Sequence, residues 1–171
     1  MIARREKDLI LFSFSSLERK VLERALAVLI ESYKVRPEEV DAKATAVWYS
    51  SRGCKIARMS TDETSEWLKH LHTLRVGRIE VLENCRKQLS ERSQPPWMLQ
   101  VPVQKAEALM TALNDYRLLI AARHDIGETE MSLRTLASWS KLPPEQQTAL
   151  WQIEFLAYVV DELLHLLQEA S

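Results

Sequence analysis

The segment from about residue 145 to near the C-terminus constrains the fold more than any other part of the sequence. Apolar residues recur there at helical spacing and cover most of the circumference of the predicted helix: Leu150, Ile153, Leu156, Ala157, Val160, Leu163, Leu164 and Leu167. A helix that is apolar on nearly every side is either the central helix of a core or part of an oligomer interface. The sequence therefore predicts a helical domain that packs around this segment.

The polar residues of the same helix form one narrow stripe. Its members follow one another at intervals of four, three, four and three residues: Glu154, Tyr158, Asp161, His165 and Gln168, with Glu162 beside them. The stripe either faces water or lines an interior site. The spacing of Glu162 and His165 also matches one half of a di-iron bundle site, but no other histidine follows an acidic residue by three positions. We therefore predict no metal.

The rest of the chain predicts a mainly α (α+β) protein, with one helical-bundle domain of about six helices and two short strands over residues 1–171. Ser15 with Glu18, and Ser60 with Glu63, match the capping box that begins a helix. The expected strands cover residues 8–14 and 97–101. The expected helices cover residues 17–33, 37–49, 63–91, 102–123 and 130–139, before the last helix.

Two stretches of the chain resemble each other at an offset of 87 residues. Each predicts a strand that turns sharply into an amphipathic helix, over residues 9–33 and 97–123. We interpret them as two similar strand–helix units inside the single domain, whose strands could lie side by side. The alternative is a chance similarity between two strand–helix junctions.

Two arginines, Arg78 and Arg117, fall on the apolar faces of predicted helices, and Arg75 lies close to Arg78. A buried arginine needs a partner, because burying an isolated charge is very costly. We expect the partners to be acidic residues of the last helix: Glu154, Asp161 and Glu162. Together with His165, these residues form a candidate pocket for an anionic ligand. The alternatives are a structural network of ion pairs, or arginine stems that cover apolar surface while their heads reach water.

Several classes of function find no support in the sequence. The three glycines are too far apart to form a phosphate-binding loop, and no serine elbow motif is present. We therefore predict no catalytic residue and no cofactor. The N-terminus has no apolar signal region, and no stretch is long and apolar enough to span a bilayer. The two cysteines show no sign of a disulfide framework, which fits a reducing compartment. We expect a cytoplasmic protein without membrane contact, and a net charge of −1 argues against nucleic-acid binding.

Residues 103–126, and residues 112–126 most of all, resemble domain-of-unknown-function family twenty-seventeen of bacteria, through the motif Leu-Asn-Asp-x-Arg-Leu at Leu113–Leu118. The strand–helix junction at Leu9–Leu26 and the closing helix at Leu150–Leu167 resemble the family as well, whereas Trp48–Pro96 departs from it. The resemblance carries over Asn114, Asp115 and Arg117, and implies no established activity. Genes of this family often lie beside the gene for ClpS, the adaptor of Clp proteases. On our helical spacing Arg117 faces the core and Asp115 faces solvent, which favours a structural motif.

These observations favour a non-enzymatic interaction or adaptor protein, linked through the resemblance to Clp-type regulated proteolysis. It would bind a protein partner through an apolar surface that contains tryptophan, or form a homodimer. The first alternative is a sensor or enzyme for an anionic small molecule at the arginine and carboxylate residues. The second is a transcriptional regulator. A closed ion-pair network would favour the interaction protein, and an open pocket with an unpaired arginine would favour the sensor.

Overall fold

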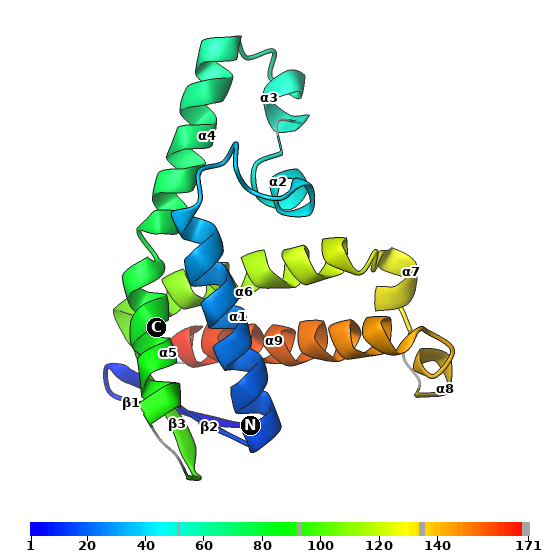
Figure 1. Cartoon of the computed structure of the whole chain (residues 1–171). Helices are drawn as coiled ribbons and strands as arrows, with labels where there is room; N and C mark the ends of the chain where they lie inside the picture. The colour runs from blue at the N-terminus through cyan, green and yellow to red at the C-terminus, as the bar shows by residue number, and fades with distance from the viewer. Residues whose placement is uncertain (51, 92–93, 134–135, 169–171) are drawn as a thin grey trace.

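Two long helices that run side by side in opposite directions form the centre of the structure (Figure 1). They are α6 (Val103–Arg123) and α9 (Pro144–Gln168) of a computed structural model, which describes residues 1–50, 52–91, 94–133 and 136–168. Buried leucine, isoleucine, valine and phenylalanine side chains run along the whole of α9. The central role predicted for the last helix is therefore confirmed, and the fold is mainly α with a small sheet.

An antiparallel sheet in the order β1–β2–β3 closes one end of the bundle (Figure 1). The strands are β1 (Ile2–Glu6), β2 (Leu9–Phe14) and β3 (Trp97–Pro102). The two predicted strands are confirmed. Strand β1 was not predicted, because its outward side chains give this stretch the polar sequence that is typical of an unstructured terminus. Strands β2 and β3 are hydrogen-bonded neighbours. The two strands therefore lie side by side, but because they are antiparallel the two strand–helix junctions lie at opposite ends of the pair. That the two units are similar by more than chance stays a prediction.

Helix α1 (Ser16–Lys34) crosses the central helices, and its predicted capping box is present. The Ser15 hydroxyl accepts from the Glu18 amide, and the Glu18 carboxylate accepts from the Ser15 amide at 2.8 Å. These two bonds satisfy backbone donors that a helix N-terminus otherwise leaves unpaired. Helix α1 thereby starts directly after β2, with its apolar face on the core.

The single long helix predicted over residues 63–91 is wrong, because the chain turns at Gly77 and Arg78. Helix α4 (Thr61–Val76) precedes the turn and α5 (Ile79–Glu91) follows it. Helix α5 packs against α1 and β3, whereas α4 projects away from the bundle (Figure 1). The apolar residues on either side of the turn fit one uninterrupted helical face, so the hydrophobic pattern conceals the break.

Short helices connect the long ones, and their bounds correct two predictions. Helix α2 (Ala42–Trp48) has Asp41 as its N-cap and does not begin near residue 37. The Asp41 carboxylate accepts hydrogen bonds from two amides of the first turn of the helix. Helix α3 (Arg52–Ile56) leads to α4. The helix predicted over residues 130–139 is two short helices, α7 (Glu128–Met131) and α8 (Leu136–Trp139). The last three residues of the predicted domain lie outside the described residues.

Candidate functional site: a buried arginine–aspartate cluster

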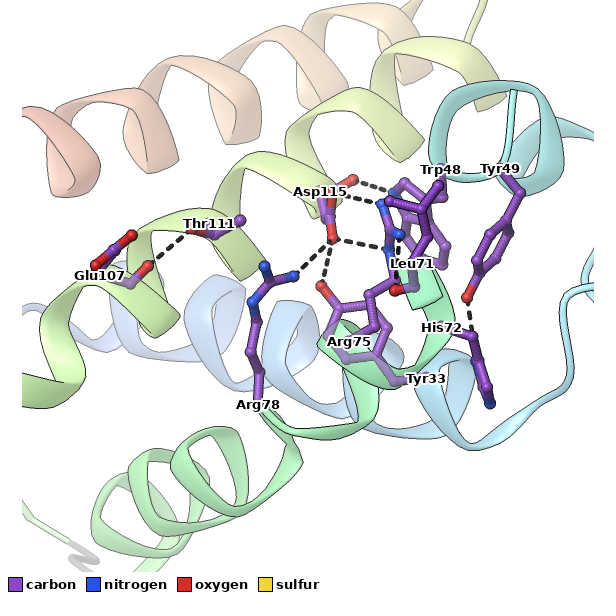
Figure 2. Close-up of polar contacts among 10 residues, drawn as sticks. All are labelled: Tyr33, Trp48, Tyr49, Leu71, His72, Arg75, Arg78, Glu107, Thr111 and Asp115. Atoms are coloured by element: carbon purple, nitrogen blue, oxygen red, sulfur yellow. Dashed lines mark hydrogen bonds and ion pairs between the residues drawn. The ribbon is translucent and has the colours of Figure 1, made fainter. Parts of the chain in front are cut away.

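The carboxylate of Asp115 on α6 is the centre of a buried polar cluster (Figure 2). The Tyr33 hydroxyl of α1 donates to Asp115 Oδ2 at 2.7 Å. Arg75, in the last turn of α4, places Nε 3.1 Å from Oδ2 and one terminal nitrogen 3.3 Å from Oδ1. Arg78, in the turn between α4 and α5, lies 3.8 Å from Oδ2. Three segments of the chain thus converge on one carboxylate.

Aromatic rings from α2 and its C-terminal end hold Arg75 from the other side. The guanidinium carbon lies 4.9 Å from the ring centre of Tyr49 and 5.8 Å from that of Trp48. The indole of Trp48 also donates to the backbone carbonyl of Asp115 at 2.8 Å. A guanidinium over an aromatic face is attracted by the electron density of the ring. The cluster therefore joins α1, α2, α4 and α6 by directional contacts.

The charges and hydrogen bonds of the cluster favour a closed arrangement. Burial raises the pKa of Tyr33 well above its usual range, and the negative charge of Asp115 raises it further. Tyr33 consequently stays protonated and donates at every physiological pH. Two arginines face one carboxylate, and the Arg75 and Asp115 side chains are each only about a tenth exposed. The arrangement is that of a structural ion pair, with a protein carboxylate already in the place that an external anion would take.

The partners of Arg75 and Arg78 differ from those predicted. Asp115 was expected on the solvent side of α6 but is only 8% exposed, which corrects that prediction. The side of α6 that carries Asp115 also carries Ala112 and Leu119, both fully buried, because α6 packs against α2 as well as α9. This second apolar side is the signal that could have identified the aspartate.

The acidic residues of α9 lie elsewhere. The polar stripe of Glu154, Tyr158, Asp161, His165 and Gln168 is exposed, with Glu162 half-buried beside it. No contact joins Glu154, Asp161 or Glu162 to Arg75 or Arg78 among the residues that the structure describes. The predicted pairing of Arg75 and Arg78 with the last helix is therefore wrong.

Arg117 is half-buried, as its position on the apolar face predicts, and takes a local partner. One terminal nitrogen donates to the Asn114 side-chain oxygen at 2.6 Å. Burial lowers the pKa of Arg117, and the nearby charge of Glu154 acts in the opposite direction. Glu154 is thus close enough to interact through space, although no ion pair within 4 Å joins the two. Arg117 and Glu154 stand apart from the Asp115 cluster.

Candidate groups for other chemistry are few in the described part of the chain. Cys54 and Cys85 are both buried, and burial raises the pKa of Cys85 to about 12, which makes it a poor nucleophile. Among the described residues, no three His, Cys, Asp or Glu side chains gather in a way that could hold a metal ion. None of the described helices has the length and apolar character needed to cross a membrane.

The fold and the cluster together define a mainly α domain with a three-stranded end sheet and a buried ion-pair junction. Residues 68–167 match the family model described as Domain of unknown function (DUF2017), and the chain belongs to this family. The match contains Arg75, Arg78 and Asp115, but not Tyr33 or Trp48. It also covers residues 68–96, so the expected departure of that stretch from the family is wrong. Comparison with curated proteins and with solved structures finds no match.

Proposed function

We propose that this chain is a non-enzymatic interaction protein that inserts α4 into an apolar groove of a partner protein. The observation that carries the proposal is the exposed apolar face of α4. Trp67 and Leu74 are 43% and 46% exposed, and Leu71 between them is partly buried. Their spacing of four and three residues places them on one side of the helix. This is the pattern by which a single amphipathic helix anchors in a groove.

The shape of the molecule supports a projecting helix as the contact. Helix α4 projects from the bundle together with α3, whereas α2 packs against α6 (Figure 1). Arg75 is the buried residue of α4, and it lies in the last turn, next to the bundle. Leu68 and Leu71 pack partly against the core, and most other side chains of the helix are exposed and accessible to a partner. Tryptophan is also among the residues that most often carry the binding energy of an interface.

The buried cluster supports this proposal because it fixes the C-terminal end of α4 against the bundle. The contacts of Arg75 and Arg78 with Asp115 tie the end of α4 and the following turn to α6. A helix that is held in one orientation before binding loses less conformational entropy when it binds. The cluster thus has a structural use that needs no ligand.

An adaptor role in Clp-type regulated proteolysis is the finer form of this proposal. Its support is the resemblance to a family whose genes often adjoin that of ClpS. An adaptor needs a surface for a second protein, and the exposed face of α4 supplies one candidate. In this form, the groove that receives α4 belongs to a Clp component.

The test compares capture of partners by three forms of the tagged protein in host extract. Wild type and the double variant Trp67→Ala/Leu74→Ala are used with a control, Leu118→Ala/Leu164→Ala, whose residues are exposed to 50% and 42% on α6 and α9. We expect one defined protein, quantified by mass spectrometry, to accompany wild type and control but not the α4 variant. Recovery of a Clp component supports the finer form. Equal recovery by all three forms, or no stoichiometric partner, refutes the proposal.

A further inference from the structure

A pocket of about 720 Å³ lies between α4, α2 and the connection that follows α1. Its apolar lining includes Leu68 and the ring of Tyr49. Its charged and polar lining includes Arg36, Glu38, Lys69 and His72. This size and this mixture of an apolar wall with a few polar groups are typical of sites for small ligands. Trp67 and Leu74 do not line it, so the inference below does not depend on the proposed function.

The two cations of the pocket are available to a ligand. Among the residues that the structure describes, Arg36 has no carboxylate within ion-pair distance. Lys69 contacts Glu66 at 2.7 Å, but both side chains are more than two-thirds exposed, so this pair is weak and readily exchanged. Glu38 is the acidic residue of the lining. The lining therefore carries two positive charges and one negative charge, which suits one negative charge on a ligand.

A hydrogen-bonded pair of side chains, Tyr49 and His72, adds to this lining. The Tyr49 hydroxyl lies 3.3 Å from Nδ1 of His72 (Figure 2). Burial raises the pKa of Tyr49, so the phenol keeps its proton and can donate to Nδ1. A neutral imidazole that accepts at Nδ1 carries its proton at Nε2. His72 then presents an N–H donor from the wall of the pocket.

We propose that this pocket binds a small organic monocarboxylate. Its apolar body packs on Leu68 and the ring of Tyr49, and its carboxylate is held by Arg36 and Lys69. The same chemistry is found in a free organic acid and in the C-terminal residue of a peptide. Glu38 disfavours ligands with two negative charges, since like charges repel each other.

The test is a titration of the isotope-labelled protein with phenylacetate, followed through its backbone amide NMR signals. We expect saturable shifts at Leu68, Lys69 and His72. Phenethylamine, which has the same apolar body and a positive charge, should bind at least several-fold more weakly. Arg36→Gln should weaken phenylacetate binding about two- to five-fold, and Glu38→Gln should strengthen it by a similar factor, as expected for partly exposed charges. These residues are exposed, so the variants should fold.

The control is Lys87→Gln on α5, another exposed lysine with a glutamate partner on its own helix, and it should leave the affinity unchanged. The peptide acetyl-Gly-Gly-Phe and its C-terminal amide distinguish the two sources of the carboxylate, a free organic acid and a peptide C-terminus. Tighter binding of the free peptide than of phenylacetate assigns the site to a peptide C-terminus, and equal or weaker binding assigns it to a free acid. Absence of saturable shifts through the millimolar range, equal binding of phenethylamine, or unchanged affinity in both charge variants would overturn the proposal.

Discussion

Replacing Asp115 by alanine should be among the most destabilising changes in the protein. The substitution removes the acceptor of the Tyr33 hydroxyl, and a hydrogen bond to a charged group contributes about 1.5–3 kcal/mol. It also leaves the guanidinium of Arg75 buried without its carboxylate, which costs a further ~1–3 kcal/mol. Arg78 adds little, because it is one-fifth exposed and water can replace the ion pair.

The sum agrees with the cost of about 3–5 kcal/mol that is typical when one partner of a buried ion pair is removed. Chemical denaturation measures the free energy of unfolding directly. In a domain of this size each kcal/mol lowers Tm by about 2–4 °C, so thermal unfolding should shift by roughly 6–20 °C. The double variant Arg75→Met/Asp115→Leu should recover part of the loss, because it removes both charges and fills their volume. A loss below about 1 kcal/mol for Asp115→Ala would refute the reasoning.

Three further changes test other parts of the structure. Asp41→Ala should cost about 0.5–2 kcal/mol, because Asp41 caps α2 and pairs with Arg123 at 2.7 Å. The amides of α2 and Arg123 lower the pKa of Asp41. Denaturation curves should therefore show the full contribution of Asp41 to the free energy of unfolding above about pH 4, and this contribution should decline as the pH falls through the lowered pKa. Gly77→Ala should be neutral or stabilising by up to ~1 kcal/mol in the same assay, because Gly77 has a φ of −61° that alanine adopts; a loss above that amount would contradict this. Cys85 should react with a thiolate-specific reagent only as fast as the protein opens, whereas rapid reaction of the native protein would show that the thiol is accessible.

Local features of the fold could be predicted from the sequence because their causes are local. The capping boxes at Ser15 and Ser60 depend on residues three positions apart, and both are present. The all-round apolar pattern of α9 identified the central helix for the same reason. The turn at Gly77 escaped prediction because the apolar spacing continues through it, and the change of direction depends on packing of α5 against α1.

The partner of the buried arginine could not be predicted from the residue spacing within a single helix. The need of a buried arginine for a partner follows from charge alone, and it was predicted. The identity of that partner depends on how α4 and α6 cross, which spacing within either helix does not encode. Asp115 lies among Ala112 and Leu119 on a second buried side of α6, and treating that helix as one-sided placed the aspartate in solvent. A helix that is buried on two sides therefore needs both sides inspected for charged residues.

Site-specific crosslinking from α4 tests most directly whether this helix is the binding surface. A photoreactive phenylalanine derivative would replace Trp67 in one form of the protein and Leu118 in a matched form, and both would be irradiated in living host cells. We predict a discrete crosslinked product from position 67 and none from position 118. Identical products from both positions, or no product from position 67, would contradict the proposal that α4 is the helix that contacts a partner.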